Sequence, residues 1–196
     1  MTVRTLLVAG LCCAPLLSGC APVILGGGAA IGVAAAQERT IGAAIDDTFI
    51  QARISDALLQ HSGTLFLRVG MEVLEGRVLL TGTVRDPQDR VEVVRIAWSV
   101  PGVREVLNEI QVSERGTIAD TIADARVTGT LRFQIMGDRA VSDFNYSIDT
   151  VNGIVYLMGI AQNQAERDRV VGYARNINGV KQVVNHVVLR DDPRRR

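Results

Sequence analysis

The stretch Gly76-Arg77-Val78-Leu79-Leu80-Thr81-Gly82 recurs later in the chain as Gly153-Ile154-Val155-Tyr156-Leu157-Met158-Gly159. The same separation of 77 positions relates two further pairs, Pro101-Gly102-Val103 with Asn178-Gly179-Val180, and Asn108 with Asn185. A constant separation between several short motifs indicates an internal repeat. The sequence therefore predicts two homologous modules, one after the other.

Each module is expected to begin with a helix. Apolar residues recur at the spacing of one helical face, at Ile50, Ile54, Ala57 and Leu58. Thr121 and Ala125-Arg126 match Thr48 and Ala52-Arg53 at a spacing of 73, which predicts four extra residues before the first strand of the second copy. The equivalent face there is then Ala123, Val127, Thr130 and Leu131. Asp46 or Asp47 is the expected N-cap of the first helix.

A hairpin follows each of these helices. In the first copy the strands are 69–73 and 78–84, joined at Glu75-Gly76, and in the second copy the joint is Asn152-Gly153. An Asn-Gly pair favours the type I′ turn of a two-residue hairpin, because both central residues need a positive φ.

A second helix is expected near Pro87, because proline suits the first turn of a helix. Its inward face includes Val94 and Ala97, which correspond to Val171 and Ala174. The last strands alternate through Val106, Asn108, Ile110 and Val112, and through Val183, Asn185, Val187 and Leu189. The predicted fold class is α+β, with two modules at 45–113 and 118–190. Each has the order helix, strand, strand, helix, strand and packs two helices on one face of a small mixed sheet.

The start of the chain has the layout of an exported protein. Arg4 and an apolar stretch precede Leu17-Ser18-Gly19-Cys20, which resembles a bacterial lipobox. The resemblance implies a signal peptide at 1–19 and a Cys20 that carries diacylglycerol and an N-acyl chain. The alternative is a transmembrane helix, because no charged residue occurs between Arg4 and Glu38. Prolines and glycines within that run disfavour it, and residues 20–44 are expected to form a flexible Gly/Ala-rich tether.

Composition excludes several classes of protein. Cys12 and Cys13 belong to the predicted signal peptide, and acylation of Cys20 would leave the mature chain no thiol for a disulfide or a metal. Without Arg4, the 20 basic and 21 acidic residues give a net charge of −1, so no strong field is available to attract nucleic acid. His61 and His186 lack a metal-ligand spacing, and no nucleophile motif such as G-x-S-x-G is present. We expect no enzyme activity and no cofactor.

The order of elements, the G-x-V-x-L-x-G hairpin, the P-G-V turn and the closing V-x-N pattern resemble the BON domain over residues 38 to 189. Two copies behind a lipobox are similar to the dual-BON outer-membrane lipoproteins of the DolP type and, less closely, to the periplasmic OsmY type. The resemblance implies an outer-membrane lipoprotein on the periplasmic side that supports envelope integrity. It also implies that the second module binds anionic phospholipid, such as phosphatidylglycerol.

The resemblance places the lipid contact on the first helix of the second module, at 117–132. The candidate lipid-binding residues are Ile118, Thr121, Ile122, Ala125, Arg126 and Arg132. Apolar side chains on this stripe suit the headgroup region of a membrane, and the arginines suit phosphate. Members of the family commonly have an aromatic residue at the position of Ile122, and Asp120 and Asp124 are expected to add negative charge nearby. The alternative is that Ile118 and Ile122, aligned with Ile45 and Phe49, widen the buried face of the helix.

Trp98 is a candidate partner-binding residue. Its counterpart is Arg175, so this position is expected to be partly exposed or to lie between the modules. The alternative is that Trp98 fills a gap in the packing of its own module. An exposed Trp98 favours a different role for the protein, as an adaptor that binds outer-membrane assembly proteins.

The chain ends in a charged tail at 191–196. Such a short segment has nothing apolar to bury, so we expect it to remain disordered and solvated. Its three arginines offer the alternative of a contact with anionic lipid.

Overall fold

The computed structural model describes residues 41–113 and 118–195. Cys20 and the signal peptide predicted at 1–19 lie outside the described residues. The first module contains α2 (Ile41–His61), α3 (Gly63–Arg68), β1 (Val69–Leu74), β2 (Arg77–Val84), α4 (Pro87–Ser99), β3 (Glu105–Asn108) and β4 (Gln111–Val112). The second contains α5 (Ile118–Gly137), the short 3-10 helix η2 (Asp143–Asn145), β5 (Tyr146–Val151), β6 (Ile154–Ala161), α6 (Gln164–Asn176) and β7 (Gln182–Leu189), followed by the 3-10 helix η3 (Pro193–Arg195). The α+β class and the tandem order of elements are confirmed.

Both hairpins have the predicted turn. Glu75 and Gly76 have φ of 53° and 73°, and Asn152 and Gly153 have φ of 53° and 80°. Positive φ at both central residues is the property of a type I′ turn, whose twist matches that of the flanking strands. The turn sets the antiparallel register, with Leu74 opposite Arg77 and Val151 opposite Ile154.

The glycine that ends each repeated motif permits a close approach between backbones. A Cβ on Gly82 would lie 2.1 Å from the carbonyl oxygen of Arg68, and one on Gly159 would lie 2.2 Å from that of Asn145. No other residue fits at such a distance, so the spacing of the G-x-V-x-L-x-G motif follows from packing.

The second helix of each module crosses over to a parallel strand. Asp86 caps α4 by accepting the Gln88 N–H at 2.8 Å, and Pro87 is the first residue of the helix, as predicted. Asn163 caps α6 by accepting the Glu166 N–H at 2.9 Å. After these helices, β3 and β7 pair in parallel with β2 and β6, so β2 and β6 are the central strands.

The first helix of each module buries equivalent positions. Ile50, Ile54 and Leu58 face the first core, and Val127, Leu131 and Ile135 face the second. These triplets are 77 positions apart, the same distance as the hairpins, so the predicted spacing of 73 and its four-residue insertion are wrong. Ala123 and Thr130, which the shorter spacing placed on the core face, are exposed.

The two aspartates expected at the helix start do not cap it. The helix α2 begins at Ile41, so Asp46 and Asp47 lie within it. The buried carboxylate of Asp47 instead accepts the N–H groups of Glu75 at 2.7 Å and Gly76 at 2.8 Å. It therefore fixes the hairpin turn to the helix.

The last strands differ between the modules. β7 is continuous, whereas its counterpart is divided into β3 and β4 at Glu109 and Ile110. In both modules the asparagine of the V-x-N pattern accepts a backbone N–H two residues ahead, from Ile110 at 3.3 Å and from Val187 at 3.0 Å. The first module also has the short helix α3, capped by Ser62, which the sequence pattern did not predict.

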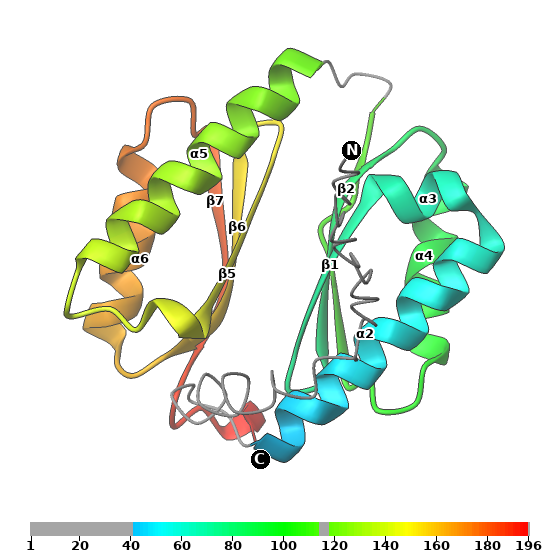
Figure 1. The fold of residues 1–196 in the computed structure, drawn as a ribbon, viewed down its shortest axis with the longest axis horizontal. Coiled ribbons are helices and arrows are strands. Elements are labelled where there is room, and N and C mark those ends of the chain that lie inside the picture. Colours follow the sequence, from blue (N-terminus) through cyan, green and yellow to red (C-terminus); the bar gives the residue numbers. More distant parts are fainter. Residues whose placement is uncertain (1–40, 114–117, 196) are drawn as a thin grey trace, which may run out of the picture.

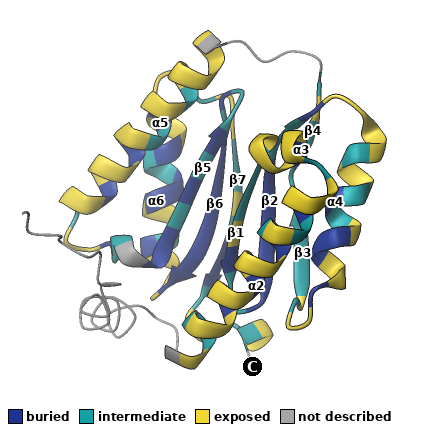
Figure 2. Ribbon diagram, turned by 45° about the vertical axis from the view of Figure 1, so that its right-hand side comes forward, coloured by how far each residue is buried: buried dark blue, intermediate teal, exposed yellow. Residues whose placement is uncertain are grey.

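The two sheets pack against each other, with the helices on the outside (Figure 1). Residues of the central strands alternate between the two faces: Val78 and Leu80 point to the helices, and Leu79 points to the other sheet. Leu79 forms a buried cluster with Tyr156 and Met158 of β6. This arrangement makes four layers, helix, sheet, sheet, helix, and Figure 2 shows that burial concentrates in the strands between the helical layers.

Polar contacts surround the apolar centre of this inter-module interface. Gln111 donates to the Tyr156 hydroxyl at 3.1 Å and receives the side-chain amide of Asn152 at 2.8 Å. Thr81 donates to Asp149, and His186 lies 2.9 Å from Glu109. The modules are thus joined by specific contacts as well as by apolar burial.

The C-terminal segment is ordered, which corrects the prediction of a solvated tail. Residues 193–195 form η3, and Arg195 forms an ion pair with Glu75 of the first module at 2.8 Å. Figure 1 shows this red segment beside the start of α2. The prediction failed because the contact joins residues 120 positions apart.

Candidate lipid-binding helix and groove of the second module

The outer side of α5 carries an exposed stripe of apolar and small residues. They follow the i, i+3, i+7, i+11, i+14 spacing of one helical face, at Ile122, Ala125, Gly129, Phe133 and Met136. Ile122 is 65% exposed and Phe133 is 80% exposed. The buried triplet Val127, Leu131 and Ile135 occupies the opposite side of the helix. We call the five exposed residues the α5 stripe.

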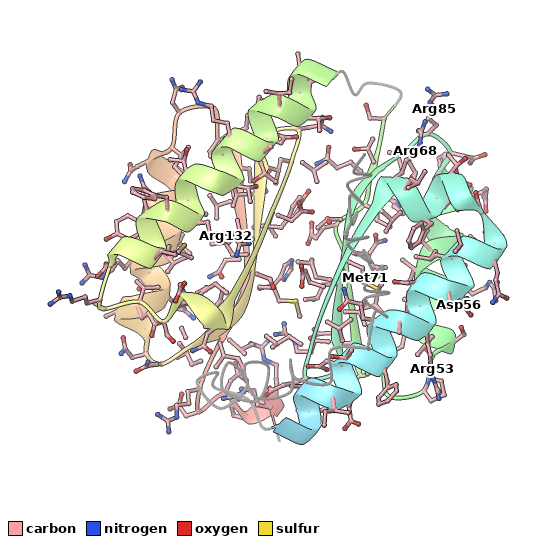
Figure 3. The ribbon with its side chains drawn as sticks, viewed as in Figure 1. Arg53, Asp56, Arg68, Met71, Arg85 and Arg132 are labelled. Atoms are coloured by element: carbon pink, nitrogen blue, oxygen red, sulfur yellow. The ribbon has the colours of Figure 1, made fainter. Side chains whose placement is uncertain are left out.

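Two arginines flank the α5 stripe. Arg126 and Arg132 are both exposed, and the 3.6-residue period places them on opposite sides of the stripe. Figure 3 shows Arg132 on the outer layer of the second module. An apolar strip with guanidinium groups along both edges is the composition of an interfacial helix.

The structure brings most of the predicted lipid-binding residues together. Thr121, Ile122, Ala125, Arg126 and Arg132 are all exposed on α5. Ile118 begins the helix, and its side chain lies outside the described residues. Since Ile122, Ile45 and Phe49 are exposed, the alternative that they widen the buried face is wrong for these three residues.

Phe133 and Met136 are the residues that sequence reasoning missed. The predicted surface stopped at Arg132, although the spacing of the stripe continues for one more turn. Phe133 supplies to this surface the aromatic ring that the family resemblance placed at Ile122. A search for exposed positions opposite Val127, Leu131 and Ile135 would have found both residues.

Of the two aspartates expected to add negative charge near the stripe, Asp120 is exposed on α5, and the other is Asp124. Its carboxylate accepts the N–H of Asn152 at 2.6 Å and the N–H of Gly153 at 2.7 Å, so it faces the β5–β6 turn. It plays the same part as Asp47 in the first module. The Asp124 carboxylate lies on the side of α5 away from Phe133, and these two hydrogen bonds offset its charge there.

A groove of about 700 Å³ lies beside the α5 stripe. It is enclosed by α5, the β5–β6 turn and the loop after α6, and its lining includes Ile122, Arg126, Asn152 and Lys181. The Lys181 ammonium donates to the Asn152 carbonyl at 2.8 Å, which holds this cation at the rim. The groove, which we call the second groove, therefore combines the apolar side chain of Ile122 with two cations and with the carboxylates of Asp120 and Asp124.

The first module offers a poorer version of this surface. On α2 the equivalents of the stripe are Ile45, Thr48, Ala52, Asp56 and Leu59. Asp56 replaces Phe133, so a carboxylate stands in the middle of the strip, and Ser55 replaces the flanking Arg132. Figure 3 shows Asp56 near Arg53 on the outer helix of the first module. A charged centre disfavours insertion into an apolar layer.

Trp98 is 52% exposed, so the prediction of partial exposure is confirmed. It lies on α4, which covers the helical face of the first sheet, whereas the second module contacts the other face (Figure 2). A position between the modules is therefore wrong for this residue. Val91, two turns earlier on the same helix, is also exposed.

The described residues contain no metal site: within 41–113 and 118–195, no three His, Cys, Asp or Glu side chains converge to hold an ion. His61 lies 3.6 Å from Glu92, and His186 contacts Glu109 across the modules. Both histidines therefore have a carboxylate neighbour within the fold. In the same ranges, no helix is both long and apolar enough to span a membrane.

Comparison with known proteins agrees with the repeat seen in the structure. The model of the BON domain matches residues 46–114 and 123–191, two ranges that are also 77 positions apart.

An uncharacterized protein from Anaplasma centrale is 40% identical over 78% of this chain and 100% of its own length. The outer membrane lipoprotein DolP of Haemophilus influenzae is 32% identical over 86% of this chain and 87% of its own. The osmotically-inducible protein Y of Escherichia coli is 27% identical, with coverage of 74% and 73%. The chain belongs to the BON-domain family and carries two copies of the domain in tandem.

Proposed function

We propose that the protein is a lipid-anchored protein at the periplasmic face of the outer membrane, whose second module binds anionic phospholipid and thereby supports envelope integrity. The α5 stripe is the observation that carries this proposal. The likeness of the chain to a relative named as an outer membrane lipoprotein supports the location, and the Leu17–Cys20 motif supports the lipid anchor. The role is one of binding without catalysis.

The α5 stripe suits a membrane surface for a physical reason. Ile122, Phe133 and Met136 extend into solvent, so a bilayer interface is a better environment for them than water. The stripe extends over about 20 Å of helix, which lets the side chains enter the headgroup layer together when α5 lies flat. Arg126 and Arg132 then meet lipid phosphates, each contributing about 1 kcal/mol near an anionic surface.

The anchor and the stripe reinforce each other. The diacylglycerol and the N-acyl chain expected on Cys20 would hold the protein stably at the membrane, because more than one lipid chain suffices for anchoring. Acyl chains on Cys20 would supply the first contact and raise the local concentration of lipid around α5. Binding of the α5 stripe would then depend on the headgroups of the membrane to which the protein is already attached.

Vesicle flotation tests the proposal. A protein that begins at Gln37 lacks Cys20 and retains all helices and strands of the described ranges. We expect it to float with vesicles that contain phosphatidylglycerol and to float less as salt is raised, because screening weakens the arginine contacts. Vesicles of phosphatidylcholine alone should recover little protein. Equal flotation with both vesicles, or none with either, contradicts anionic-lipid binding.

A second candidate function is that of an adaptor for outer-membrane assembly proteins. It rests on Val91 and Trp98, which are exposed on the same helix and resemble the anchors of protein interfaces. Trp98→Ala should release a co-purifying protein, and an unchanged pull-down contradicts the adaptor function. A role in osmotic stress, as the name of the Escherichia coli relative suggests for that protein, is a further alternative.

A further inference from the structure

The two modules have equivalent grooves, and the first of them contains a side chain from a distant part of the sequence. The first groove, of about 580 Å³, lies between α2, the β1–β2 turn and the Pro101–Arg104 loop. It corresponds to the second groove at an offset of 77, so Glu75 takes the place of Asn152, and Arg104 that of Lys181. The first groove also contains Arg195, which comes from the other end of the chain.

Arg195 makes a two-pronged contact inside the first groove. Its Nε donates to one carboxylate oxygen of Glu75 at 2.9 Å, and its Nη2 donates to the other at 2.8 Å. The Arg195 side chain is 14% exposed and the Glu75 side chain is 13% exposed. This fork geometry is specific for a guanidinium, and shielding from solvent strengthens the pair.

Hydrogen bonds within the segment that precedes Arg195 hold this arginine toward the first groove. The Asp192 N–H donates to the Leu189 carbonyl at 3.0 Å, and the Asp192 carboxylate pairs with Arg194 at 2.7 Å. The Arg194 carbonyl accepts a hydrogen bond from Arg104 at 3.4 Å. Leu189 ends β7 of the second module, so the segment crosses from one module to the groove of the other.

We propose that the first groove is a binding site for an arginine-bearing chain segment, and that residues 191–195 are its ligand in cis. The occupied groove ties the end of the second sheet to the hairpin turn of the first module. Removal of Arg195 would take away the guanidinium that pairs with the carboxylate of Glu75 and would open the first groove to water. The second groove carries no acid at the position of Glu75, so it does not share this specificity.

Binding of the tail in trans tests the proposal. A chain that ends at Arg190 keeps β7 and opens the first groove. A labelled peptide with the sequence of residues 190–196 should bind it saturably in fluorescence anisotropy and should not bind the chain that ends at Arg196. Glu75→Gln in the shortened chain should reduce the affinity at least tenfold, as should a peptide with lysine at position 195. No binding to a shortened chain with unchanged circular dichroism, or binding that ignores Glu75→Gln, overturns the proposal.

Limited trypsin digestion of the protein that retains residues 191–196 gives a second test, which does not depend on truncation. Cleavage after Arg194, followed by mass spectrometry, should be at least tenfold faster in Glu75→Gln than in the unaltered protein. Glu72→Gln is the matched control, because Glu72 lies on β1 and is exposed. Equal cleavage rates in the two variants contradict an occupied groove. Neither test involves lipid, so its outcome is independent of the proposed membrane function.

Discussion

Asp47 and Asp124 occupy the same place in the two modules, 77 positions apart, and each clamps the hairpin turn of its own module. Each carboxylate projects from the first helix and accepts two successive backbone N–H groups. Charge-assisted bonds of this kind are stronger than neutral ones. The pair therefore sets how the first helix of each module lies against its sheet.

Loss of the Asp47 carboxylate should destabilise the protein. Asp47→Ala leaves the N–H groups of Glu75 and Gly76 without their acceptor, and we expect the free energy of unfolding to fall by about 2–4 kcal/mol. Urea denaturation measures the change. Asp46→Ala is the control, because Asp46 is the exposed neighbour and should change stability by about 0.5 kcal/mol or less. Similar losses in the two variants would contradict the clamp.

The close approach at Gly159 should make this position intolerant of a side chain. Gly159→Ala places a methyl group against the Asn145 carbonyl, and we expect a loss of at least about 1–3 kcal/mol. Gly172→Ala, at a helical position with open space around it, should instead raise stability by about 0.5–1 kcal/mol. Thermal unfolding measures the change in Tm of both variants. A change of Tm in the same direction for both would refute the predicted contrast.

The buried cluster between the sheets should hold the modules together. Met158 is fully buried there, so Met158→Glu places a carboxylate in a layer that excludes water. We expect the modules to separate and the radius of gyration from small-angle X-ray scattering to increase. Leu67→Glu, at an exposed position on α3, should leave the radius unchanged. An unchanged radius for Met158→Glu contradicts the face-to-face arrangement.

Alkaline titration should report two buried tyrosines. Burial, together with the neighbouring Glu166 carboxylate, raises the pKa of Tyr146, and burial also raises the pKa of Tyr156. A pKa that is higher in the folded state stabilises the fold fully below the ordinary value of about 10 and loses this contribution as the pH rises above it. We therefore expect part of the tyrosinate absorbance to appear only as the protein unfolds, and Tyr146→Phe to reduce that part. Ionisation of Tyr146 and Tyr156 near pH 10 in the folded protein would show that both phenols reach solvent.

Local signals account for what the sequence predicted well. Asn152-Gly153 has the backbone preference of a type I′ turn, and Pro87 marks a helix start for the same kind of reason. The α+β order followed from these elements. The pairing of the two sheets has a signal in β6, which is apolar on both faces, as buried strands are.

The wrong spacing of 73 has a physical explanation. It rested on identical residues, Thr48 with Thr121 and Ala52-Arg53 with Ala125-Arg126, all of which are exposed and therefore weakly constrained. The buried triplets differ in identity, Ile-Ile-Leu against Val-Leu-Ile, because apolar residues of similar volume exchange readily in a core. The contact of Arg195 with Glu75 was beyond local reasoning, since no pattern near either residue indicates it.

The most direct test of the account is flotation of paired variants of the protein that begins at Gln37, with vesicles that contain phosphatidylglycerol. Ile122→Glu with Phe133→Glu places two carboxylates in the α5 stripe, and Ile45→Glu with Leu59→Glu places two at exposed positions of α2. We expect at least about a tenfold loss of binding for the first pair, since each apolar side chain withdrawn from the interface costs more than about 1 kcal/mol, and a much smaller loss for the second pair. Equal losses, or full binding by a folded protein with the first pair, would contradict membrane recognition through α5.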